Sequence, residues 1–159
     1  MKKTILIVED NKELSEMFKI KFEKGGFNVF ISDNGFDSLG LAIEKEPDLI
    51  LLDIMMPDMD GFETLKVLKE QTSLKTKIFI FSNLKSDDHI KKAKKLGADD
   101  YLVKADYTPK EVLDKVILSI GPADDKKSIF CSDADKTFVS QCPHCGEKFK
   151  LDIKISKDE

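Results

Sequence analysis

Short apolar runs alternate with longer amphipathic stretches along most of the chain. Five runs rich in Ile, Val, Leu and Phe are typical of buried strands, and they lie at Thr4–Val8, Phe27–Ile31, Leu49–Asp53, Lys77–Phe81 and Asp100–Val103. The second run is the weakest, and we expect it at a sheet edge. This alternation predicts an α/β fold in which a parallel sheet carries helices on both faces.

Apolar residues also recur at helical spacing between these runs. We interpret three sets as core-facing stripes: Leu14, Met17, Phe18 and Phe22; Leu65 and Leu68; and Val112, Val116 and Ile120. Gly25-Gly26 is expected to end the first helix, and Thr108-Pro109 to begin the last one as N-cap and first-turn proline. Five right-handed βα units most simply form an open doubly wound sheet, which binds ligands beyond the carboxyl ends of its strands.

The alternating pattern stops near Gly121-Pro122, where a polar run follows. We therefore divide the 159 residues into a domain at 1–121, a linker at 122–129 and a small tail at 130–159. Neither a signal-peptide core nor a run of about 20 apolar residues is present, so we expect a cytoplasmic protein that does not contact a membrane.

Composition narrows the classes of partner. All 26 basic residues are lysine, and the net charge is −4. Arginine is the usual residue for gripping phosphates and reading base edges, so its absence argues against direct nucleic-acid recognition. Three cysteines without an export signal favour free thiols or metal ligands over a disulfide framework.

Charged and polar side chains follow four of the predicted strands. Glu9 and Asp10 come after the first and Asp53 ends the third, so three carboxylates converge at one edge of the sheet. Oxygen ligands of this kind suit an octahedral Mg²⁺. Ser82 and Lys104 follow the fourth and fifth strands, and a hydroxyl and an ammonium there suit the oxygens of a phosphoryl group. Either residue alone would be an ordinary helix cap or surface lysine.

Three segments carry a family resemblance. Residues 51–61 read Leu-Leu-Asp-Ile-Met-Met-Pro-Asp-Met-Asp-Gly, and residues 5–11 and 97–104 read Ile-Leu-Ile-Val-Glu-Asp-Asn and Gly-Ala-Asp-Asp-Tyr-Leu-Val-Lys. In order and spacing they closely resemble response-regulator receiver domains, over about residues 3–120. The resemblance implies a flavodoxin-like (βα)5 sheet of order 2-1-3-4-5, and a signalling protein rather than an enzyme.

The resemblance also implies a role for each pocket residue. Asp53 would take a phosphoryl group from a histidine kinase or phosphotransfer protein, and Lys104 and Ser82 would bind its oxygens. Glu9, Asp10, Asp53 and the backbone carbonyl of Met55 would hold Mg²⁺. Ser82 and Tyr101 would form the switch, with Tyr101 turning inward once the phosphate has drawn the loop after the fourth strand towards it. A protein partner would bind the face of the fourth helix, fifth strand and fifth helix, and a homodimer is a further alternative.

One position departs from the family pattern. The family usually has a proline with a cis peptide bond after the lysine, whereas this chain has Lys104-Ala105-Asp106. A non-proline cis bond costs about 3–4 kcal/mol, so we expect a trans bond and a reshaped loop. Asp106 also adds a negative charge near the pocket.

The tail contains a second candidate site. Cys142-Pro143-His144-Cys145-Gly146 resembles one knuckle of a zinc ribbon, and Cys131 supplies a third thiol. Asp133, Asp135, His144 or a group from another chain would complete a four-ligand zinc site. A thiol redox pair and a vestigial ribbon without metal are the alternatives, and the tail is too short for a helix-turn-helix output module.

Two other functions compete with the phosphoryl-accepting switch. A docking module that works without phosphorylation would keep the fold but not the chemistry, and the retained pocket residues argue against it. A hydrolase of the aspartyl-phosphatase kind typically carries a second aspartate two positions after the first, where this chain has Met55.

Overall fold

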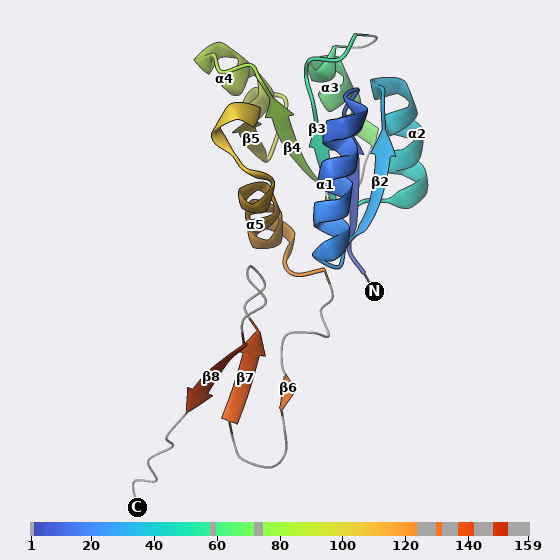
Figure 1. The fold of residues 1–159 in the computed structure, drawn as a ribbon. Helices are drawn as coiled ribbons and strands as arrows, with labels where there is room; N and C mark the ends of the chain where they lie inside the picture. Colours follow the sequence, from blue (N-terminus) through green and yellow to red (C-terminus); the bar gives the residue numbers. More distant parts are fainter. Residues whose placement is uncertain are drawn as a thin grey trace, which may run out of the picture.

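The computed structural model describes residues 2–57, 60–71, 75–123, 130–131, 137–141 and 148–152. Strands and helices alternate over the first 120 residues (Figure 1). Their order is β1 (Thr4–Val8), α1 (Lys12–Lys24), β2 (Asn28–Ser32), α2 (Gly35–Lys45), β3 (Leu49–Leu52), α3 (Gly61–Gln71), β4 (Lys77–Ser82), α4 (Asp87–Lys95), β5 (Asp100–Val103), the 3₁₀ turn η1 (Lys104–Asp106) and α5 (Pro109–Ile120).

The five strands form one parallel sheet in the order β2-β1-β3-β4-β5. This confirms the α/β class, the doubly wound (βα)5 architecture and the strand order implied by the family resemblance. The weakest predicted strand, β2, lies at an edge as expected. Because the strand order reverses between β1 and β3, the loops after these two strands splay apart and leave room for a site between them.

Side chains that alternate along each strand enter two separate cores, one on either face of the sheet. On β1, Ile5 and Ile7 pack with α1 and α5, whereas Leu6 and Val8 pack with the α2, α3 and α4 side. Successive strand residues point to opposite faces, so a strand covered on both sides must be apolar at every position. This explains why the strands of this chain are continuous apolar runs.

The strand boundaries differ from the sequence prediction by one residue in four places. The second strand begins at Asn28 and not at Phe27, because the Phe27 N–H donates to Phe22 O and closes the end of α1. The same strand ends at Ser32, one residue after the predicted Ile31. The third strand ends at Leu52, and Asp53 lies in the loop that follows. The fourth strand continues to Ser82, which pairs with Val103 of β5.

Predicted helix ends agree with the structure. Gly25 caps α1, and Gly26 adopts a φ of 93°, a left-handed conformation that favours glycine. Thr108 caps α5 in a reciprocal capping box with Glu111, and Pro109 occupies the first turn.

One predicted core residue is wrong. Met17 is 43% exposed, whereas Phe18 and Phe22 of the same helix are buried. Each residue turns an α-helix by about 100°, so a side chain next to the buried Phe18 points away from the sheet. Leu65, Leu68, Val112 and Val116 are all fully buried, as predicted.

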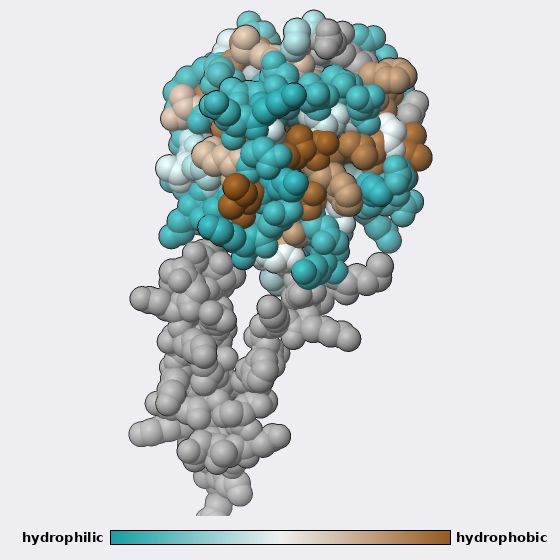
Figure 2. Space-filling model, turned by 45° about the vertical axis from the view of Figure 1, so that its right-hand side comes forward, coloured by the Kyte–Doolittle hydropathy of each residue, from teal (hydrophilic) through white to brown (hydrophobic). Residues whose placement is uncertain are grey.

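Edge strand β2 leaves a groove of about 560 Å³ between α1 and α2. Its lining includes Val29, Phe30, Ile31 and Leu41 together with charged residues of both helices. Figure 2 shows apolar patches on this side of the domain, set in a largely hydrophilic surface.

The first two residues of the predicted linker, 122 and 123, are among the described residues, and the second still packs on the domain. Ala123 is buried, and its carbonyl accepts a hydrogen bond from the Lys3 N–H. Beyond it, β6 (Phe130–Cys131), β7 (Thr137–Gln141) and β8 (Lys148–Asp152) form an antiparallel sheet in that order. The polar run at 124–128 lies outside the described residues, so the boundaries at 121 and 129 stay predictions.

Candidate functional site: an acidic pocket at the strand ends

Four parallel strands deliver the pocket residues to one edge of the sheet. Val8 of β1 pairs with Leu52 of β3, so the next residues, Glu9 and Asp53, leave the sheet side by side. The Asp53 N–H donates to Val8 O and holds the two strand ends together. Ser82 and Val103 pair at the end of β4 and β5, and Lys104 follows directly.

Three carboxylates meet there. One oxygen each from Glu9, Asp10 and Asp53 lies within 4.8 Å of the other two. Glu9 and Asp53 are each only 4% exposed, whereas Asp10 is exposed to solvent. This is the acidic cluster that the sequence predicted, and among the described residues no other group of three or more acidic, histidine or cysteine side chains is close enough to hold a metal ion.

Lys104 bridges the two buried carboxylates. Its Nζ donates to Glu9 Oε2 and to Asp53 Oδ2, each at 2.6 Å, and its side chain is 12% exposed. The Nζ atom also lies over the Phe81 ring, 5.6 Å from the ring centre. Lys104 follows β5, three strands away from β1 in the sheet, and supplies the cation for both acids.

The electrostatics of the pocket follow from this burial. Loss of solvent raises the pKa of Glu9, and the hydrogen bond from Lys104 only partly offsets the effect. Burial acts to lower the pKa of Lys104, but the hydrogen bonds to Asp53 and Glu9 outweigh it and raise the pKa above its ordinary value. The pocket thus holds a charged lysine and has a deficit of positive charge that a further cation would relieve.

The loop after β3 is shaped around Asp53. The Met55 N–H donates to Asp53 Oδ1 at 2.9 Å, while the Met55 side chain is exposed. The role of the Met55 carbonyl as a metal ligand stays a prediction.

A glycine allows this loop to fold back on itself, and sequence reasoning assigned it no role. A Cβ added to Gly61 would lie 2.3 Å from Ile54 Cα and 2.7 Å from Asp53 O. Asp60, the residue before it, accepts from the Phe62 N–H and caps α3. The signal was present in the Asp-Gly pair at 60–61, but the close approach depends on the loop conformation.

Ser82 and Tyr101 are both buried beside the pocket. Ser82 is fully buried, and its Oγ accepts from the Leu84 N–H at 3.4 Å. Tyr101 is 8% exposed and its hydroxyl donates to Leu84 O at 2.8 Å. Burial raises the pKa of Tyr101, although a hydrogen bond with Ser82 acts in the opposite direction. Tyr101 therefore already points inward, where the sequence prediction expected it only after phosphorylation.

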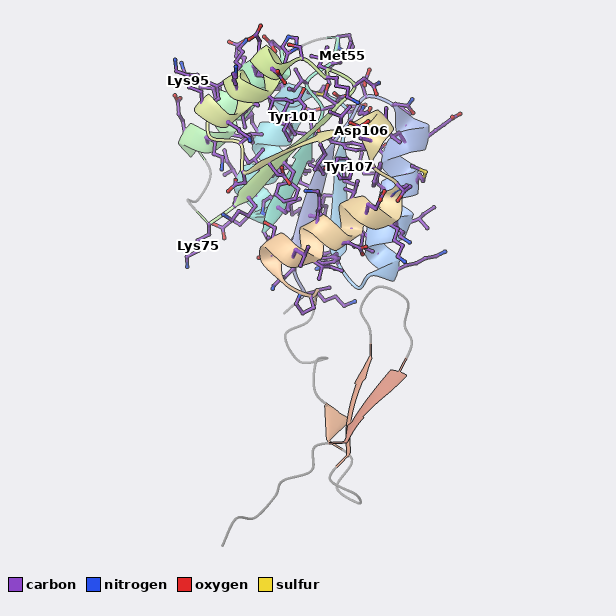
Figure 3. All side chains as sticks on the ribbon, turned by 90° about the vertical axis from the view of Figure 1, so that its left-hand side faces the viewer. Met55, Lys75, Lys95, Tyr101, Asp106 and Tyr107 are labelled. Carbon is purple, nitrogen blue, oxygen red and sulfur yellow. The ribbon has the colours of Figure 1, made fainter. Side chains whose placement is uncertain are left out.

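Ala105, where the chain departs from the family pattern, lies in a short turn. None of the peptide bonds between described residues is cis, in agreement with the expected trans bond after Lys104. Residues Lys104–Asp106 form η1, and Asp106 Oδ1 accepts from Lys85 Nζ at 2.9 Å across the pocket entrance. Figure 3 shows Tyr101 and Asp106 on the side of the molecule formed by α4, β5 and α5. Sequence reasoning noted the charge of Asp106 but missed its partner Lys85.

The predicted zinc site falls mostly outside the described residues. Cys142 and Cys145 are not among them, nor are Asp133, Asp135 and His144. Cys131 lies in β6 opposite Phe138 of β7. The zinc hypothesis therefore rests on the sequence alone.

The match to a family model gives this pocket its context. Residues 5–117 match the model described as the response regulator receiver domain. The chain belongs to this family. Receiver domains of response regulators are signalling proteins and not classical enzymes, as the sequence predicted. They interact with a histidine kinase or phosphotransfer protein.

Curated relatives and solved structures agree with this assignment. The alkaline phosphatase synthesis transcriptional regulatory protein PhoP of Bacillus subtilis is 33% identical over 112 residues, which are 70% of this chain and 46% of that protein. The transcriptional regulatory protein CusR of Escherichia coli is 39% identical over 100 residues, 63% of this chain and 44% of that protein. A CheY-like receiver domain from Methanospirillum hungatei superposes with a TM-score of 0.72 at 27% identity, covering 76% of this chain and 94% of that one.

The activated receiver domain of Klebsiella pneumoniae RstA gives a TM-score of 0.69 at 28% identity, covering 74% of this chain and 98% of that one. The chain spans about half the length of the curated relatives it matches. Some relatives are named as DNA-binding response regulators, so the expectation of no direct nucleic-acid contact stays untested. No helix among the described residues is long and apolar enough to cross a membrane.

Proposed function

We propose that this receiver domain is a phosphoryl-accepting switch whose acceptor is Asp53. The observation that carries the proposal is the paired contact of Lys104 Nζ, 2.6 Å from both Asp53 and Glu9, inside a cluster of three carboxylates. A buried carboxylate is a nucleophile for phosphoryl transfer when cations neutralise the charge around the transferred group.

The reaction is an exchange of one bond to phosphorus for another. An Asp53 carboxylate oxygen attacks the phosphorus of a phosphohistidine, the phosphorus–nitrogen bond breaks, and the histidine ring leaves and takes up a proton. Lys104 leaves the Asp53 carboxylate and donates to an oxygen of the new acyl phosphate. Ser82, at the same edge of the sheet, donates a hydrogen bond from its hydroxyl to another phosphoryl oxygen.

The donor set fits Mg²⁺. Glu9, Asp10 and Asp53 offer hard oxygen ligands within 4.8 Å of one another, and exposed Asp10 leaves a side open to waters, which Mg²⁺ retains in most protein sites. The charge count is a second supporting observation, because three carboxylates share one lysine here and such a site gains most from a divalent cation. When bound, the ion would neutralise charge on the transferred group, and the Met55 carbonyl would be a further ligand.

The output would pass through the surface of α4, β5 and α5. Ser82 and Tyr101 both contact Leu84 at the start of the β4–α4 loop, so a change at the phosphoryl site reaches this surface through one residue. A downstream protein partner, or a second copy of the chain, would bind there. We keep the cytoplasm as the expected compartment, because kinases and their receivers exchange phosphoryl groups there.

Phosphorylation with a small donor tests the proposal. The full chain is incubated with acetyl phosphate and Mg²⁺, and intact mass is measured for the wild type and for Asp53→Asn. We expect one added phosphoryl group on the wild type, a requirement for Mg²⁺, and no addition on the variant. A wild type that takes up no phosphoryl group would instead favour the docking module that works without phosphorylation. No described feature of the pocket favours that module.

A further inference from the structure

Two loops flank the entrance to the pocket, and one ion pair joins them. The β4–α4 loop follows Ser82, and η1 begins with Lys104. Lys85 of the first and Asp106 of the second meet at 2.9 Å between Nζ and Oδ1. Their side chains are 70% and 44% exposed, so solvent and salt reach the contact. In the part of the chain that the structure describes, neither Lys85 nor Asp106 contacts the three carboxylates of the pocket.

A second contact ties the same loop to the same segment. The Tyr101 hydroxyl donates to Leu84 O, next to Lys85 in the chain. Tyr101 lies three residues before Lys104, and Asp106 lies two residues after it. The β4–α4 loop is therefore held at two points, one on each side of Lys104 in the sequence. Leu84 N–H in turn donates to Ser82 Oγ, the hydroxyl that our proposed function assigns to the phosphoryl group. The position of the loop and the orientation of Ser82 are therefore linked.

We propose that the Lys85–Asp106 ion pair restrains the β4–α4 loop and slows phosphorylation of Asp53. Ser82 must turn its hydroxyl towards a phosphoryl oxygen, and the loop that now donates to this hydroxyl must move with it. The ion pair opposes that movement. Lys85 and Asp106 are positioning residues that act through Leu84 and Ser82 and do not touch the reacting atoms. The inference rests on the proposed function and adds its regulation.

A simpler electrostatic effect makes a different prediction. Lys85 would attract an anionic phosphoryl donor and Asp106 would repel it, so loss of Lys85 would slow the reaction and loss of Asp106 would speed it. If the two act as a pair, loss of either one releases the loop and both substitutions speed the reaction. The signs of the two single variants therefore separate the two explanations.

The experiment compares initial rates of phosphorylation of the full chain by acetyl phosphate and Mg²⁺, followed by intact mass; acetate is the leaving group. The variants are Lys85→Gln, Asp106→Asn, both together, and the exchanged pair Lys85→Asp with Asp106→Lys. We expect each single variant to react about 1.5-fold to 5-fold faster than the wild type, the range typical of exposed ion pairs. The double variant should gain no more than either single one, and the exchanged pair should return towards the wild-type rate.

Salt and a distant ion pair provide the controls. The ratio of variant to wild-type rate should fall towards one at high salt, because salt screens exposed pairs. Lys45 and Glu44 form a comparable exposed pair at the far end of α2, and Lys45→Gln and Glu44→Gln should leave the rate unchanged. Circular dichroism checks that all variants keep the fold.

Each outcome decides one of the two proposals. Opposite signs for the single variants, equal rates for all variants, or an exchanged pair that stays fast would each overturn the restraint while leaving Asp53 as the acceptor. A wild type that takes up no phosphoryl group would overturn the proposed function, and the restraint with it.

Discussion

Replacing Lys104 tests how the pocket balances its charge. The substitution Lys104→Met keeps the length of the apolar stem and removes the ammonium, which leaves Glu9 and Asp53 buried without their shared cation. Removing one partner of a buried ion pair typically costs about 3–5 kcal/mol. Because Lys104 is 12% exposed, we expect a loss near the lower end, about 3 kcal/mol in the free energy of unfolding at neutral pH.

Mg²⁺ should reverse much of this loss. In the wild type, Lys104 occupies the Glu9 and Asp53 oxygens that a metal would use, so metal binding has to displace it. Without the lysine the same oxygens are free, and the variant should bind Mg²⁺ more tightly than the wild type. An ion at about 100 times its dissociation constant stabilises the folded state by about 2.7 kcal/mol, which is close to the expected loss.

The assay is urea unfolding of both proteins over a Mg²⁺ titration. Sodium chloride at matched ionic strength separates specific binding from screening, and Lys94→Met serves as an exposed-lysine control. We expect a steeper Mg²⁺ dependence for Lys104→Met and none once Asp53→Asn is added. Equal Mg²⁺ dependence in the wild type and Lys104→Met would refute the view that lysine and metal compete for the same oxygens.

Three further predictions concern the frame around the pocket. Burial acts to raise the pKa of Asp99, but hydrogen bonds from Lys69, the Ile78 N–H and Lys77 lower it below its ordinary value of 3.8. The ionised carboxylate therefore stabilises the fold above pH 3.8, and this stabilisation is lost as the pH falls through the pKa of the folded state. The difference in the free energy of unfolding between the wild type and Asp99→Asn, measured in urea, should shrink on acidification below pH 3.8. Thr108→Ala removes the α5 cap and should cost about 1 kcal/mol, read as a lower urea midpoint with an unchanged slope. Gly61→Ala should lower the free energy of unfolding by about 1–3 kcal/mol and slow phosphorylation of Asp53. Gly40→Ala has open space at its Cβ, so it should raise the free energy of unfolding by about 0.5–1 kcal/mol and leave phosphorylation unchanged.

Sequence patterns predicted the sheet well because its strands are buried on both faces. Thr4–Val8 and Asp100–Val103 were predicted to the residue, since an apolar run between polar residues marks both ends of a covered strand. Phe27 looked like part of the second strand but closes α1 instead. That choice depends on which carbonyl its N–H reaches, and hydrophobicity does not record it.

The pocket was predictable to the extent that it depends on the sheet. Glu9, Asp53 and Ser82 sit at strand ends, and the parallel register alone brings strand ends together. The close packing of Gly61 and the contact of Lys85 with Asp106 were not predicted, because both depend on loop conformations that no periodic pattern encodes.

Lys104 shows how far the register controls the site. The residue after it breaks the family pattern, and we expected a reshaped loop there. Yet Val103 pairs with Ser82, so Lys104 leaves the sheet at the pocket edge whatever residue follows. Its Nζ lies over the Phe81 ring and reaches both carboxylates at 2.6 Å. Ala105 lies in η1, and the cation of Lys104 still lies in the pocket although the family's proline is absent.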